Sequence, residues 1–332
     1  MNKLNQTPLS VLNLAPVAHD DTMRDAMNKS TDLAQHTESL GYQRFWLAEH
    51  HNMDGIASAA TSVLMNHVAE HTSSIRIGAG GIMLPNHAPL TIAEQFGTLG
   101  TLHPDRIDLG IGRAPGTDQL TARALRQSGG GAEQFPEMLN ELINYFEADA
   151  PQRVEAYPGR GVNVPVWLLG SSSFSARLAG RLGRPFAFAA HFAPAQMMEA
   201  LKVYHENFQP SAHLDEPYAM AAINVLAADT NEEAEYLATS LYQKFVNLMR
   251  NQSLRTQPPV ETMEGIWHDR EKMAVQEMLK YSYIGDAARI KQQLENFIET
   301  TKVNEVMIST EAYDHEATKR SFEITAALTH DQ

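Results

Sequence analysis

The chain has 332 residues, a formal net charge of −14 at pH 7 and no cysteine. The lack of thiols excludes disulfides, cysteine-ligated zinc and a thiol nucleophile, and the acidic balance argues against nucleic acid and anionic membranes as partners. No apolar run approaches the ~20 residues that cross a bilayer. The N-terminus has no signal-peptide pattern, so we expect a soluble protein of the reducing cytoplasm.

Short β-rich runs alternate with longer helical patterns through the first half of the chain. The first run, 9–14, precedes a helix whose N-cap is Asp20, Asp21 or Thr22 and whose stop signal is Gly41. Three further strands are expected at 44–48, 75–80 and 106–111, and a helical pattern follows each of them.

The second half repeats this rhythm, with one long interruption. Strands are expected at 164–169, 185–190, 219–227 and 305–309. After the third of these comes a segment of mostly helical character, about 231–283, which Pro258-Pro259 interrupts. Such a segment suits a lid over a site or an insertion that packs an oligomer.

Eight strands, each followed by a helix, predict one α/β domain over residues 1–332. This is a single (β/α)8 TIM-type barrel with a helical insertion after the seventh strand. A doubly wound open sheet shares the alternation but would need a glycine-rich dinucleotide fingerprint after an early strand. The nearest candidate, Gly110-Ile111-Gly112, has Pro115 where the third glycine should stand, so the barrel is favoured.

The second expected strand ends in Glu49-His50-His51. Active sites of such barrels are built from the loops after the strands. Because side chains alternate along a strand, only one of His50 and His51 can face the mouth directly. A histidine here often only caps a backbone group, but three titratable residues together favour acid/base chemistry near neutral pH.

The third and fourth expected strands end in glycines and arginines. Gly80 and Gly81 let a ligand approach the backbone closely, or form a plain corner bend. Arg113 follows Gly112, and Arg123 lies further along the same loop. Arginines beside glycines at a barrel mouth suit a phosphate or carboxylate clamp, although Arg123 alone would be interpreted as a surface residue.

The fifth expected strand ends in a run of serines. Ser171, Ser172, Ser173 and Ser175 follow Gly170, and a helix begins at once. One serine is enough for an N-cap, whereas several at a helix N-terminus provide hydroxyl and N–H donors for an anion.

Together these segments resemble the luciferase-like flavin-dependent monooxygenases, relatives of the bacterial luciferase subunits. The resemblance covers most of the chain and is clearest in RFWLAEHH, IRIGAGGIMLPNHAPLTIAEQFGTL, RIDLGIGRAPGTD and WLLGSSSFSARLAGRLG. It implies a barrel that binds FMN at its C-terminal mouth. The positions that match the family's flavin and phosphate contacts are Arg113, Arg123, Ser171, Ser172 and Ser175.

The resemblance also implies roles for the second and third strand ends. Gly80-Gly81 matches a pair that family members join by a non-proline cis peptide bond beneath the flavin ring. His50 matches a histidine thought to act in acid/base steps near the flavin. Gly112 stands where the luciferase catalytic subunit has a reactive cysteine, which weakens a light-emitting role but not oxygenase chemistry.

The implied activity is the oxidation of a small organic substrate, such as an aldehyde, by reduced FMN and O2. No dinucleotide fingerprint is present, so we expect a separate NAD(P)H-dependent reductase to supply the reduced FMN. Relatives are commonly dimers, and a homodimer is therefore expected.

Three alternatives stay open at this point. The same barrel could use the deazaflavin F420 for hydride transfer, or bind a flavin without catalysis. A metal-dependent hydrolase could use histidines at other strand ends, namely His19, His87 and His191, although the first strand lacks the paired histidines that such enzymes usually carry.

Overall fold

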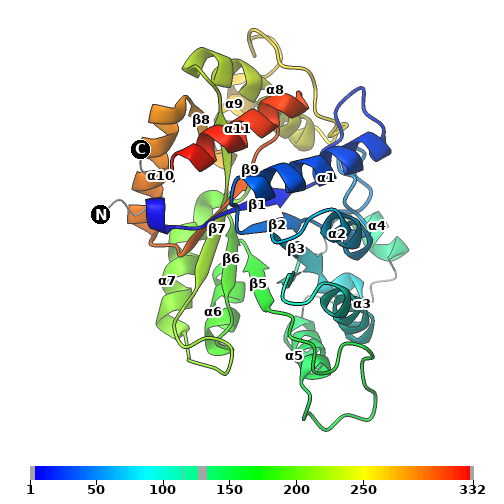
Figure 1. Ribbon diagram of the computed structural model, residues 1–332. Coiled ribbons are helices and arrows are strands. Elements are labelled where there is room, and N and C mark those ends of the chain that lie inside the picture. The colour runs from blue at the N-terminus through cyan, green and yellow to red at the C-terminus, as the bar shows by residue number, and fades with distance from the viewer. Residues whose placement is uncertain (1–3, 115, 126–132, 330–332) are drawn as a thin grey trace.

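The computed structural model describes residues 4–114, 116–125 and 133–329. Within them, eight parallel strands close into a barrel in the order β1-β2-β3-β4-β5-β6-β7-β9, and β9 pairs back with β1. Figure 1 shows this barrel at the centre of the molecule with helices around it. The strands are β1 (Leu9–Asn13), β2 (Arg44–Leu47), β3 (Arg76–Met83), β4 (Ile107–Gly112), β5 (Val166–Gly170), β6 (Phe186–Ala189), β7 (Ala219–Ala227), β8 (Ser282–Gly285) and β9 (Glu305–Ser309).

Helices follow the strands and cover the barrel. They are α1 (Met23–Ser39), α2 (Thr61–Glu70), α3 (Pro89–Leu102), α4 (Gln119–Ala124), α5 (Phe135–Phe146), α6 (Ser173–Arg181), α7 (Met197–Asn207), α8 (Asn231–Met249), α9 (Asp269–Met278), α10 (Ala287–Thr301) and α11 (His315–Ala327). The predicted TIM-type barrel is confirmed. No helix in the described ranges combines the length and apolarity needed to span a bilayer.

The predicted start and stop of the first helix are confirmed. Thr22 is the N-cap of α1: its hydroxyl accepts from the Asp25 N–H at 3.2 Å, and the Asp25 carboxylate accepts from the Thr22 N–H at 2.9 Å. Gly41 follows the helix with φ +82°, a left-handed conformation that favours glycine.

Alternation along the strands separates two apolar cores. Phe45 and Leu47 of β2 pack outward against the helices, whereas Trp46 between them points into the barrel. There the rings of Trp46 and Trp167 meet edge to face with centroids 5.2 Å apart. The barrel is therefore a filled core, and ligands must bind at its ends.

The segment predicted as a mostly helical insertion, about 231–283, is helical only in α8 and α9. Residues 250–268 contain no helix, and the end of the segment enters a strand, β8, that the sequence prediction missed. The cause is the length of β7: its first half pairs with β6, and its last residues, Asn224 to Ala227, extend beyond β6 and pair with β8 instead.

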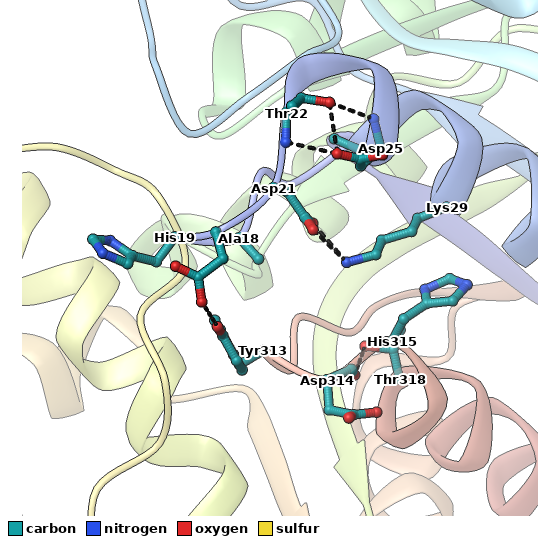
Figure 2. A network of polar contacts seen from close by, with 12 residues as sticks. Ala18, His19, Asp21, Thr22, Asp25, Lys29, Tyr313, Asp314, His315 and Thr318 are labelled. Carbon is teal, nitrogen blue, oxygen red and sulfur yellow. Dashed lines mark hydrogen bonds and ion pairs between the residues drawn. The ribbon is translucent and has the colours of Figure 1, made fainter.

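The non-helical part of the insertion is fixed to the loop after β1. Thr256 donates its N–H to the Val17 carbonyl and accepts from the His19 N–H, both at 2.9 Å, and Arg255 donates to the Asp21 carbonyl at 2.8 Å. Figure 2 shows the same loop, in which the Asp21 side chain points at Lys29. The distance between Asp21 Oδ2 and Lys29 Nζ is 2.6 Å. A lid movement of this segment would have to break these bonds, and the lid itself stays a prediction.

Candidate active site

The carboxylate of Glu49, directly after β2, is the centre of a buried hydrogen-bond network. Its side chain is 1% exposed. It accepts from His51 Nε2 at 2.8 Å, from His87 Nε2 at 2.9 Å and from the Met83 N–H at 3.0 Å. His87 and Met83 belong to the chain around the end of β3, so one carboxylate joins the loops after two neighbouring strands.

Competing effects set the charge of Glu49. Burial raises the pKa of its carboxyl, but the hydrogen bonds from His87, His51 and the Met83 N–H outweigh burial and leave the pKa below its ordinary value. Glu49 is therefore ionised at neutral pH, and it holds His51 and His87 in place beside the mouth.

His50, predicted as the proton-handling residue, lies half-buried between this network and the loop after β4. Its Nδ1 faces the Gly116 carbonyl at 3.4 Å. Burial lowers the pKa of His50, the Gly116 carbonyl opposes this, and the charge of Lys244 lowers the pKa further, so that it lies below the ordinary value. A neutral imidazole at neutral pH can accept a proton.

A second imidazole, His191 after β6, carries a polar atom without a partner. Its Nδ1 is buried and has no hydrogen bond to any residue that the structure describes. Burial lowers the pKa of His191 to about 3, and His50 is near enough for its charge to lower the pKa as well. The two neutral imidazoles thus occupy one region of the mouth, from strands that lie far apart in the sequence.

The insertion contributes a cation to this region. Lys244 of α8 is buried and pairs with Glu311, which follows β9. Lys244 is near enough to His50 for its positive charge to contribute to lowering the pKa of that histidine. Sequence reasoning missed Lys244, Glu311 and His191 as a group, because an ordinary lysine in a helical insertion gives no signal of where it packs.

Gly80 and Gly81 form a backbone surface in β3, and the bond between them is cis, as the resemblance implies. A Cβ at Gly81 would lie 2.6 Å from the Gly110 carbonyl oxygen, and one at Gly80 would lie 3.0 Å from Leu12 Cδ1. The close approach of β3 and β4 therefore requires glycine at Gly81.

The N-terminus of α6 keeps its donors available. Ser172 is the N-cap with extended backbone, and its side chain makes no capping hydrogen bond. Ser171 beside it is half-buried, whereas Ser175 is buried, with its Oγ 2.6 Å from where a Cβ at Gly170 would lie. Uncapped N–H groups at a helix start favour an anion.

Arg113, the residue directly after β4, lies beside this helix start. Its guanidinium lies over the Phe174 ring at 4.3 Å, and it makes no ion pair or hydrogen bond with the described part of the chain. The fold thus brings together Arg113 and the serine run, as the sequence predicts. Arg123 is different: it is exposed in the last turn of α4, where the described residues give it no ion pair, and Gly129-Gly130-Gly131 beyond it lies outside the described residues.

The histidines of the hydrolase alternative are spread over different environments. His87 is bonded to Glu49, while His19 lies at the rim and points away from Asp21 and Lys29 in Figure 2. Among the residues that the structure describes, no group of three or more His, Asp or Glu side chains is arranged to hold a metal ion.

Several known proteins that match most of this chain are described as monooxygenases. The family profile described as luciferase-like monooxygenase matches residues 9–304. A luciferase-like monooxygenase of Escherichia coli is 50% identical over 317 residues, which cover 95% of each chain. An N-acetyl-S-alkylcysteine monooxygenase of Bacillus subtilis is 37% identical over 241 residues, 68% of this chain and 70% of that protein.

Solved structures agree with the barrel. The crystal structure of apo-MsnO8 is 30% identical, covers 98% of both chains and superposes with a TM-score of 0.88. The oxygenating constituent of a Pseudomonas putida diketocamphane monooxygenase, solved with FMN, covers 96% of both chains at 15% identity and a TM-score of 0.70. An F420-dependent secondary alcohol dehydrogenase covers 98% of this chain and 100% of that chain at 14% identity, with a TM-score of 0.72. The last two likenesses concern the fold alone.

Proposed function

Because this chain belongs to the luciferase-like monooxygenase family, we propose that it is an FMN-dependent monooxygenase that oxidises a small organic substrate with O2. The proposal combines membership of the family with polar groups at the mouth that have no partner in the described part of the chain. Neither a barrel nor a histidine at a strand end would be sufficient alone.

One observation carries the choice of a phosphorylated cofactor: the uncapped N-terminus of α6 beside the unpaired Arg113. A phosphate monoester accepts from hydroxyl, N–H and guanidinium donors together. Ser171 and Ser172 would bind this phosphate with Arg113, and the buried Ser175 would shape the turn. The chain has a net charge of −14, so such binding depends on local donors rather than on the field of the whole protein.

The glycines of β3 would support the flavin ring, because they present backbone without side chains. When bound, reduced FMN supplies the electrons with which O2 gives one oxygen atom to the substrate and one to water. The residues of the chain position the reactants, exclude water and move protons.

His50 is the residue that we propose for proton transfer at the mouth. Its depressed pKa keeps the imidazole neutral, so that it can accept a proton and return it. Glu49 would act as a positioning residue by holding His51 and His87, and the unpartnered Nδ1 of His191 would hydrogen-bond to a bound molecule.

FMN is favoured over F420 because the named relatives that cover most of this chain at 37% to 50% identity are monooxygenases. The relative that acts on an N-acetyl-S-alkylcysteine suggests a thioether as a substrate class beside an aldehyde. We further propose that a separate reductase supplies the reduced FMN and that the protein acts as a homodimer.

An absorbance titration with FMN, followed by oxygen uptake with reduced FMN, tests the function. We expect saturable FMN binding and substrate-dependent oxygen uptake with a long-chain aldehyde or an N-acetyl-S-alkylcysteine. Tight binding of F420 with hydride transfer would support the F420 alternative. FMN binding without substrate oxidation across aldehydes and thioethers would support a flavin-binding protein, and sedimentation analysis at the same concentration reports the oligomeric state.

A further inference from the structure

A cavity of about 790 Å3 opens at the end of the barrel opposite to the mouth. The residues at the start of β2, β3, β5 and β6 line it, together with the chain that follows α5 and the loop before β7. Its volume is within the range of about 300–1,000 Å3 that is typical of small-molecule sites. The proposed function makes no use of this cavity.

Two of its three arginines are neutralised by buried carboxylates. Arg44 pairs with Asp108 at 2.8 Å and with Glu305 at 2.9 Å, and Arg76 pairs with Asp108 at 2.7 Å. Tyr218 donates to Glu305 at 2.8 Å. Two cations and two anions cancel, and their hydrogen bonds are satisfied, so this group is a structural base for the cavity.

The third arginine, Arg184, is buried without such a partner. It precedes β6 and is only 7% exposed. Its guanidinium makes no ion pair or hydrogen bond with any residue in the described ranges. Burial lowers the pKa of Arg184, and the nearby charge of Glu147 opposes this only in part. Glu147 itself pairs with His213 at 3.6 Å on the cavity wall.

The guanidinium of Arg184 borders the cavity, so its donors are accessible to a molecule that enters there. An anion beside the guanidinium would offset the burial of its charge. Planar guanidinium groups bind carboxylates through two parallel hydrogen bonds. The lining also includes the apolar side chains of Phe146, Val164 and Trp167, which suit a hydrocarbon body.

We propose that this cavity binds a small organic carboxylate with an aliphatic or aromatic body, whose charged group pairs with Arg184. The site lies at the end of the barrel opposite to the proposed flavin site, so the two ligands bind independently. The inference does not depend on the proposed function, because it rests on the cavity and on the charge of one residue.

Isothermal titration of the full chain with octanoate and with phenylacetate tests the site, with 1-octanol as the uncharged control. We expect at least one of the two carboxylates to bind, with at least tenfold preference over 1-octanol, and to change the tryptophan fluorescence of the protein, because Trp167 lines the cavity. Arg184→Gln should weaken binding at least tenfold, whereas Arg24→Gln, at an exposed position in α1, should leave it unchanged. Saturating FMN should not alter the affinity for the carboxylate.

The stability of the variant without ligand provides a second readout. Removing an unpaired cation should leave the free energy of unfolding of Arg184→Gln equal to or above that of the wild type, whereas Arg76→Gln breaks an ion pair and should lower it. The proposal is overturned if neither carboxylate binds at millimolar concentration, if Arg184→Gln binds as well as the wild type, or if FMN competes. A loss of stability in Arg184→Gln as large as that in Arg76→Gln would also overturn it, because Arg184 would then be paired.

Discussion

At the amino-terminal end of the barrel Arg44 and Arg76 meet the fully buried Asp108 and Glu305, whereas at the mouth Arg113 and His191 keep polar atoms that have no partner among the residues that the structure describes. Arginine therefore has a different role at each end of the barrel. An arginine with two carboxylates is already satisfied and stabilises the fold. An arginine that lies only on an aromatic ring still has its hydrogen-bond donors free for a ligand.

Pairing state thus separates structural charges from binding charges better than residue type or position does. By this criterion Arg184 resembles the residues of the mouth, because its guanidinium has no partner among the described residues, although it lies at the amino-terminal end of the barrel. Glu49 is the opposite case, because it lies at the mouth and is satisfied by His51, His87 and a backbone N–H. The comparison predicts effects on stability at satisfied positions, with the largest at the fully buried ion pairs, and effects on ligand affinity or rate at the others.

The largest effect is expected from Asp108→Asn at the amino-terminal end. The substitution leaves Arg44 and Arg76 with an amide in place of their shared carboxylate, and it weakens the bond from Trp46 Nε1 at 3.2 Å. Removing one partner of a buried ion pair costs about 3–5 kcal/mol, which urea unfolding followed by circular dichroism would measure.

The matched control is Arg320→Gln, which breaks an ion pair of 2.7 Å to Asp229 where both side chains are at least half exposed. Such pairs contribute about 0–1 kcal/mol. If Asp108→Asn were no more destabilising than this control, the buried network would not be the structural base that its geometry indicates.

The next effect concerns His50 and is an effect on rate. Under the proposed function, His50→Ala should lower kcat about 100-fold, the lower end for loss of a general acid/base. FMN affinity should change little, because the proposed phosphate donors lie at the start of α6 and directly after β4. Stopped-flow oxygen uptake gives the rate, and fluorescence titration gives the FMN affinity.

His67→Ala, at an exposed position in α2, is the control for this substitution. An unchanged kcat in His50→Ala would remove His50 from the reaction. A parallel loss of FMN affinity would show that His50 binds the cofactor rather than moves protons.

The sequence predicts the barrel well because its signals are local. Thr22 and Gly41 mark the ends of α1 through capping chemistry, and each barrel strand is a short β-rich run next to a helical pattern. β8 was missed because, within the described residues, its one strand partner is the end of β7, a contact that depends on β7 being longer than β6. Strand length relative to a neighbour is not a local signal.

The parts of the candidate site that follow from local patterns and strand order were predictable from the sequence, as the barrel was. Arg113 and the serine run lie at the ends of adjacent strands, so the barrel topology alone brings them together. The approach of His87 to Glu49, the pairing of Lys244 with Glu311 and the unpaired state of Arg184 depend on tertiary packing. No pattern within one segment reports whether a buried charge has a partner.

A smaller effect, on cofactor affinity, is expected at the free donors of the mouth. Arg113→Gln should raise the Kd for FMN about tenfold, since a hydrogen bond to a charged group contributes about 1.5–3 kcal/mol and water replaces part of it. Arg123→Gln tests the sequence prediction for the exposed arginine in the same assay. Arg24→Gln, at an exposed position in α1, removes the same single positive charge far from the proposed phosphate site and is the control.

The two arginines give different information. A loss in Arg113→Gln alone would assign the phosphate to the α6 start, and a loss in both would extend the site to α4. If the affinity of Arg113→Gln matched that of Arg24→Gln, the unpaired guanidinium would have a role other than phosphate binding.

The smallest effect concerns Glu49 and appears as a dependence of stability on pH. Its pKa in the folded protein is below the ordinary value, so its ionisation stabilises the fold above the pKa of the unfolded chain, about 4.3. This contribution is lost as pH falls through the folded pKa.

The difference in free energy of unfolding between wild type and Glu49→Gln should therefore shrink below about pH 4.3, by at most about 1.4 kcal/mol per pH unit. Glu316→Gln, an exposed position in α11, is the control and should follow the wild-type profile. A difference that stayed constant down to pH 3 would show that the histidine and backbone donors do not hold Glu49 ionised, and the division between satisfied and unsatisfied groups would then not extend to the mouth.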